Sequence, residues 1–159
     1  MRSSIILTFL TALFSLNTFA QSTEHTDNHE HHNNEIGIAN GPVYFLKEKV
    51  LSYGLHIHYI RKISHSKFGI GFGYERIFDE HQHSTFGLLV SYSPIDKLSL
   101  NVSPGITFEG GESEINFALH LETSYEFELN DFHLGPVLEF ASDPEDIHLS
   151  LGLHIGYGF

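Results

Sequence analysis

The chain is poor in the residues that would cross-link it or give it a positive surface. Its 159 residues include no cysteine, and its 8 Lys and Arg residues are outnumbered by 20 Asp and Glu residues, for a formal net charge of −12 with histidine neutral. No disulfide can form, so packing and backbone pairing must hold the fold together. Because phosphate binding needs positive charge, this balance argues against a nucleic-acid partner.

Long apolar runs are also scarce, and a short one lies at the N-terminus. Residues 1–20 carry the basic residue Arg2 near their start, followed by an apolar run over residues 5–14. They end with the small residues Thr18 and Ala20, which would precede a signal-peptidase cleavage point after Ala20. This order is typical of a secretory signal peptide, cleaved here after Ala20. A spanning helix needs about 20 apolar residues, so an uncleaved membrane anchor is the weaker alternative.

Residues 21–34, QSTEHTDNHEHHNN, lack aromatic and branched aliphatic side chains. Such a segment cannot bury enough apolar surface to fold alone, so we predict a disordered tail. Its histidines alternate with acidic residues, a composition that chelates transition metals without any fold. These candidate ligands are His25, His29, His31 and His32. An inert polar linker is the alternative.

From residue 35 onward, apolar residues recur at nearly every second position, and no helical stretch remains. A period of two is typical of β-strands. Eight such segments follow one another, over residues 36–45, 51–59, 68–75, 86–92, 98–108, 115–127, 132–140 and 147–159. The first is the least regular, because Gly41-Pro42 interrupts it and proline cannot donate to a β-ladder.

The connections between these segments are short and rich in turn residues, so neighbouring segments should pair as antiparallel hairpins. A sheet of this kind that closes on itself has no exposed edge. We therefore predict an all-β fold, an up-and-down antiparallel eight-stranded β-barrel over residues 35–159.

The composition of the two strand faces predicts which one points outward. The polar face holds Gly, Ser, Asn and His with almost no lysine, which suits the cramped interior of a small barrel better than a solvated surface. The apolar face is long enough for the roughly 9–11 residues of a tilted strand crossing a bilayer. Tyrosines lie mostly near segment ends, where aromatic girdles meet the two membrane interfaces. A transmembrane barrel is thus favoured over a soluble one with an inward apolar face.

With its predicted signal peptide, its alternation over residues 35–159 and its ending LHIGYGF, the chain resembles the small eight-stranded outer-membrane β-barrel proteins of Gram-negative bacteria, the OmpA/OmpX type. In that family a last strand with a terminal aromatic residue is the signal for the barrel-assembly machinery. The resemblance implies an outer-membrane location, contact with outer-membrane lipid, and a tail on the periplasmic side. No internal motif points to an activity, and the predicted extracellular loops are shorter than those of adhesive members.

Histidine is unusually frequent, with 13 residues in the chain. Several share the polar face with glutamates, and the up-and-down order brings five of these residues near mid-height in the lumen. Neutral imidazoles with a carboxylate are ligands of Zn²⁺, and imidazole also suits Cu²⁺ and Ni²⁺. The lumenal candidates are His56, His58, His120, Glu122 and His154. The alternative is a polar plug in which these groups satisfy one another by hydrogen bonds.

One catalytic pattern also needs weighing. His148 and Ser150 share a face with Glu139 of the preceding strand, a set that outer-membrane lipid hydrolases use. The alternation of the last strand places His148 and Ser150 on its polar, lumenal face. A lipid hydrolase would need them to contact lipid, so we do not expect an enzyme. An eight-stranded barrel filled by side chains is also no diffusion pore. The leading hypothesis is a non-enzymatic outer-membrane barrel that binds a transition metal, with a metal transport system as its candidate partner. The main alternative is a purely structural membrane-stabilising barrel.

Overall fold

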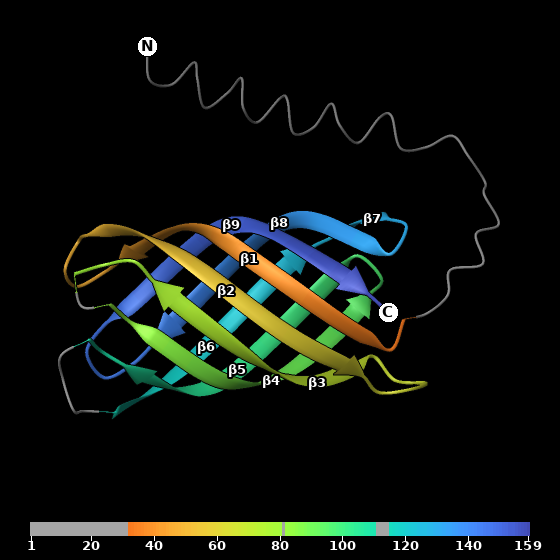
Figure 1. Cartoon of the computed structure of the whole chain (residues 1–159), viewed down its shortest axis with the longest axis horizontal. Helices are drawn as coiled ribbons and strands as arrows, with labels where there is room; N and C mark the ends of the chain where they lie inside the picture. Colours follow the sequence, from red (N-terminus) through yellow and green to blue (C-terminus); the bar gives the residue numbers. More distant parts are fainter. Residues whose placement is uncertain (1–31, 81, 111–114) are drawn as a thin grey trace, which may run out of the picture. The chain divides into compact units, whose positions relative to one another are not determined.

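The computed structural model describes residues 32–80, 82–110 and 115–159, and in these ranges the chain is built of antiparallel β-strands (Figure 1). The strands are β1 (Asn34–Phe45), β2 (Leu51–Lys62), β3 (Phe68–Ile77), β4 (Ser84–Ile95), β5 (Leu98–Phe108), β6 (Ile115–Tyr125), β7 (Phe127–Leu129), β8 (Phe132–Ser142) and β9 (Ile147–Gly158). Within the same ranges, no helix is long and apolar enough to cross a membrane. The predicted signal peptide and most of the predicted tail lie outside the described residues.

The sheet closes into a barrel. Its order is β6-β5-β4-β3-β2-β1-β9-β8-β7, and β8 also pairs with β6, so both edges are joined. The first strand therefore forms despite its proline, because Pro42 keeps its place in the β1–β2 ladder and points outward. In Figure 1, β1 in orange lies beside β9 in blue. Backbone bonds of 3.0 and 2.9 Å between Asn34 and Phe159 complete this seam.

Strands β6 and β7 act as one wall of the barrel. Their pairing with β8 keeps a single register from Leu119 opposite Ser142 to Phe127 opposite Leu134. The interruption at Tyr125 and Glu126 falls opposite Pro136 and Gly135, and Pro136 has no N–H to donate to the ladder. The nine strand segments thus make eight walls, which confirms the predicted eight-stranded barrel.

The alternation of side chains follows the predicted faces. Outward positions are apolar and exposed, and Leu88 on β4 shows the extreme at 71% exposed. Aromatic pairs cross between strands at both ends of the barrel, with ring centroids 4.9 Å apart for Phe132 and Tyr157 and 6.4 Å apart for Phe86 and Phe108. The described barrel therefore presents a continuous apolar surface to its surroundings.

The two ends of the lumen differ. We call the end that carries Asn34 and Phe159 the terminus end, and the opposite end, with the β1–β2, β3–β4, β5–β6 and β8–β9 connections, the loop end. Near the loop end, Val43 and Phe45 of β1 and Ile77 of β3 form a fully buried apolar cluster. We call this cluster the apolar plug.

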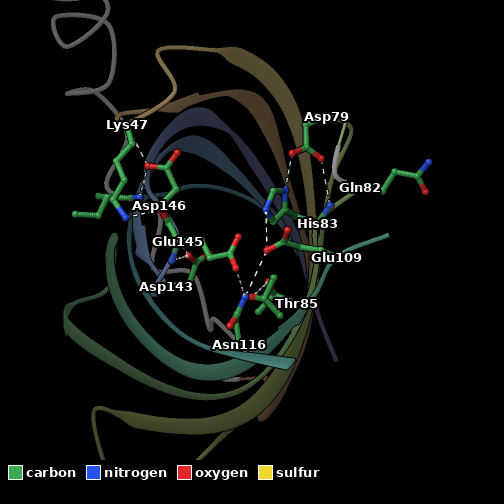
Figure 2. Close-up of polar contacts among 12 residues, drawn as sticks. Lys47, Asp79, Gln82, His83, Thr85, Glu109, Asn116, Asp143, Glu145 and Asp146 are labelled. Atoms are coloured by element: carbon green, nitrogen blue, oxygen red, sulfur yellow. Dashed lines mark hydrogen bonds and ion pairs between the residues drawn. The ribbon is translucent and has the colours of Figure 1, made fainter. Parts of the chain in front are cut away.

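Polar side chains tie the connections together above the apolar plug (Figure 2). His83 bridges two of them, with Nδ1 2.5 Å from Asp79 Oδ2 and Nε2 3.5 Å from Glu109 Oε1. On the other side of the rim, the backbone N–H of Lys47 donates to Asp146 Oδ1 at 3.1 Å. Among the described residues, the loop end thus combines apolar packing below with polar contacts above.

Candidate metal centre

Inward-facing positions of six strands carry the histidines and glutamates of the lumen. Each occupies an alternate position of its strand, so the period of two alone turns it inward. All are buried except His133, which is half-buried. The set comprises Glu35, His56, His58, Glu75, His120, Glu122, His133, Glu139, His148 and His154. Three groups within it bring one ligand atom from each of three residues to within 4.8 Å of one another.

The first group lies at the terminus end and contains Glu35, His133 and His154. His133 Nε2 is 3.3 Å from Glu35 Oε1, and the ring of His154 stacks on that of His58 with centroids 5.1 Å apart. The Lys62 ammonium lies 3.6 Å from the other oxygen of Glu35. This group therefore already contains a permanent cation beside its carboxylate.

The second group contains His56, Glu122 and Glu139. His56 Nδ1 is 3.2 Å from Glu122 Oε2, and the Asn101 amide donates to Glu122 Oε1 at 2.8 Å. Glu122 and Glu139 are directly opposite each other on β6 and β8, as their register requires. Most polar atoms of this group thus have a hydrogen-bond partner within the barrel.

The third group contains Glu75, His120 and His148 and lies directly below the apolar plug. His120 Nδ1 is 2.5 Å from Glu139 Oε1 and 3.6 Å from Glu75 Oε2. His148 Nε2 is 3.9 Å from Glu75 Oε2, and its ring packs on Phe45 with centroids 5.2 Å apart. Two imidazoles and one carboxylate from three walls of the barrel therefore converge here.

The structure places all five lumenal candidates from the sequence inside the barrel, with four of them divided among the three groups and His58 outside all three. His56 and Glu122 come together, His58 stacks on His154, and His120 belongs with other partners. The sequence did not single out Glu35, because this residue adjoins the polar tail. Its alternate position with Gly37 and Ala39 nevertheless places it on the same face of the strand. Sequence reasoning also missed His83, which it placed in an exposed loop.

Of the tail candidates, His25, His29 and His31 lie outside the described residues. His32 is described, and its Nε2 lies 3.2 Å from Asp131 Oδ1 in the β7–β8 connection. His32 thus contacts the rim of the barrel at the terminus end and belongs to none of the three lumenal groups.

The residues of the catalytic pattern face the lumen. Ser150 is the register partner of Glu139, as the sequence suggests, but the carboxylate nearest to His148 Nε2 belongs to Glu75. His148 is buried beneath the apolar plug, so the pattern does not open onto the outer apolar surface.

Comparison with known proteins identifies the fold. No protein-family model and no curated protein match the chain. Among solved structures, Neisserial surface protein A aligns with a TM-score of 0.62 at 10% identity, over 80% of this chain and 97% of that one. A de novo designed transmembrane β-barrel aligns with a TM-score of 0.58 at 14% identity, over 82% and 99%.

A third neighbour is the attachment invasion locus protein Ail of Yersinia pestis, solved with the heparin analogue sucrose octasulfate. It aligns with a TM-score of 0.52 at 16% identity, over 79% of this chain and 96% of that one. The resemblance inferred from the sequence is therefore confirmed at the level of fold, which is that of the small eight-stranded outer-membrane β-barrels.

Proposed function

We propose that this chain is a non-enzymatic integral outer-membrane β-barrel that binds a divalent transition-metal ion in its lumen. The fold and the continuous apolar outer surface support membrane insertion, since a closed barrel pairs every backbone group in lipid. The N-terminal tail then lies on the periplasmic side, where its histidines bind metal weakly and exchangeably.

One observation carries the metal proposal. Several buried imidazole nitrogens and one glutamate oxygen of the lumen have no hydrogen-bond partner among the described residues. They belong to His58, Glu75, His120, His133, His148 and His154. An unsatisfied buried polar atom costs about 1–3 kcal/mol, and one bound ion satisfies several ligand atoms together. Zn²⁺, Cu²⁺ and Ni²⁺ all accept imidazole and carboxylate ligands.

A purely structural role is the second candidate, and two contacts favour it. His56 with Glu122 and His120 with Glu139 pair directly at 3.2 and 2.5 Å. A lumen of such pairs is a polar plug that stabilises the barrel without any ligand.

Titration of the refolded barrel with Zn²⁺, Cu²⁺ and Ni²⁺ separates the two. The matched forms are the mature chain and a deletion of residues 21–31, which keeps Asn34 and its bonds to Phe159. We expect both forms to keep a tight lumenal site and the deletion to lose only weaker sites. Binding should weaken in acid, because protons compete for the ligand atoms. If neither form binds metal at micromolar concentration, the metal proposal is wrong and the structural role stands.

The same proposal names partners. Outer-membrane lipid surrounds the barrel, and the barrel-assembly machinery inserts it, with Phe159 as the terminal aromatic of the signal. A metal transport system would receive or supply the bound ion. Co-purification of metal-loaded barrel with such a system from native membranes tests this last point.

A further inference from the structure

We propose that Glu75, His120 and His148 are the ligands of the lumenal ion, and that Glu139 positions His120 for binding. This inference rests on the proposed metal-binding function and assigns it to one of the three groups. The ion class is a divalent metal that accepts two imidazoles and one carboxylate, with Zn²⁺ as the probe.

The strongest argument is the state of the ligand atoms. Glu75 Oε2, His120 Nε2 and both ring nitrogens of His148 have no hydrogen-bond partner among the described residues. All three residues are 5% exposed, so bulk water does not solvate these atoms. This is the one group of the three in which every residue offers an atom of this kind.

The other two groups are already occupied by protein contacts. In the second group, His56 and Asn101 contact both oxygens of Glu122, and Glu139 contacts His120. In the first group, the Lys62 ammonium beside Glu35 opposes the approach of another cation. An ion bound at either place would have to displace an existing partner.

Glu139 holds the ring of His120 through Nδ1 and leaves Nε2 without a hydrogen-bond partner among the described residues. A proton held on His120 Nδ1 is donated to Glu139 Oε1 at 2.5 Å, so the lone pair of the ring lies on Nε2. A carboxylate that holds the far nitrogen of a ligating histidine fixes its tautomer and raises its basicity. Glu139 therefore acts through His120 and is a positioning residue.

The surroundings leave room for a further ligand. A small cavity adjoins the group at Glu75, and its lining includes His56, Glu139 and Ser150 but not His120 or His148. Three protein ligands leave a fourth position of a tetrahedral ion to water. Since the three ligands come from β3, β6 and β9, a bound ion cross-links three separate walls of the barrel.

The test uses the chain without residues 21–31, refolded in detergent, with Zn²⁺ binding measured by calorimetry and Co²⁺ binding by its visible absorption. The site variants are Glu75→Gln, His120→Gln and His148→Gln. His133→Gln and His154→Gln are matched controls, because they make the same kind of change in the first group, whose histidines do not line the cavity beside Glu75. Thermal melts without metal check that each variant folds.

We expect each site variant to lose about 100-fold or more in Zn²⁺ affinity and the controls to lose less than about threefold. Zn²⁺ should raise the unfolding midpoint of the parent chain and of both controls, but not that of the site variants. Glu139→Gln should lose about 10- to 100-fold with one ion still bound and a shifted Co²⁺ spectrum, and Glu139→Asp should restore most of the affinity.

Two results would overturn the assignment. Binding that survives His120→Gln and His148→Gln but is lost in His154→Gln places the ion at the terminus end and leaves only the general function standing. A loss in Glu139→Gln that equals the loss in Glu75→Gln makes Glu139 a direct ligand. Absence of binding in the parent chain rejects the proposed metal function itself.

Discussion

At the scale of single residues, the lumenal imidazoles fit over glycines of neighbouring strands. A Cβ built on Gly73 would lie 2.6 Å from His56 Nε2, and one on Gly156 would lie 1.9 Å from His133 Nε2. A Cβ on Gly37 would meet His58 and His154 together. Ring-sized side chains can therefore fill so narrow a barrel because the opposing positions carry no side chain.

Gly156 and His133 give the cleanest test of this complementarity, because the three nearest atoms to the added Cβ all belong to His133. We expect Gly156→Ala to destabilise the barrel by about 1–3 kcal/mol through overpacking. In the double variant with His133→Ala the penalty of the added methyl should largely disappear. Urea unfolding in detergent measures this cycle, and additive effects of the two changes would contradict it.

His83 ties two loop-end connections through its two ring nitrogens, and its ring also packs on Phe45 at 5.4 Å. His83→Phe keeps an aromatic ring on Phe45 but removes both polar contacts. We expect faster proteolysis of the β3–β4 and β5–β6 connections in vesicles, with Zn²⁺ affinity unchanged. Glu80→Ala, at an exposed residue of the same connection, is the control. Equal cleavage rates in the two variants would show that His83 does not hold the connections together.

At the scale of elements, most strands could be predicted from alternation because the period of two also decides the face of each residue. The strand around Gly41-Pro42 looked weakest, yet β1 forms, since its neighbours β2 and β9 hold it on both sides. The break between β6 and β7 arises from Pro136 on the partner strand. The sequence of the interrupted segment alone therefore does not predict the break.

The grouping inside the lumen could not be predicted in the same way. Parity places His56 and Glu122 on the inner face, but they lie on β2 and β6, which are not neighbours in the sheet. Their 3.2 Å contact depends on the stagger of the strands and on how far each side chain reaches across the barrel. Strand stagger and side-chain reach also place His120 and His154 in different groups.

The end of β9 gives a prediction that distinguishes folding of the barrel from its assembly into the membrane of a cell. Phe159 bonds to Asn34 through its main chain, and its ring stacks outside on Tyr157 with centroids 6.0 Å apart. Phe159→Ala keeps both backbone bonds, so we expect near-normal refolding in detergent. Assembly in cells should fall sharply if the ring is the address for the assembly machinery. Tyr157→Ala is the control, and equal assembly of both variants would reject the special role of Phe159.

At the scale of the whole molecule, the barrel is filled along its length by side chains rather than by a water column. The apolar plug lies near the loop end, His148 of the third group packs against it, and the other two groups lie in the same lumen. We expect no steady channel current when the protein is reconstituted in planar bilayers. Phe45→Ala should remain non-conducting because the polar groups beneath it still fill the lumen. A stable conductance in the parent chain would show that the packed interior opens.

The apolar plug also gives the lumen a direction. Because Val43, Phe45 and Ile77 pack together near the loop end, we expect an ion bound below them to enter from the terminus end as side chains there move, where the Lys62 side chain is about half exposed. An ion bound below the plug must leave by the path along which it entered, passing the imidazoles and carboxylates of the other two groups. Each of these can recapture it. The residence time of the ion is then set by the length of this blind passage as well as by the affinity of its final site.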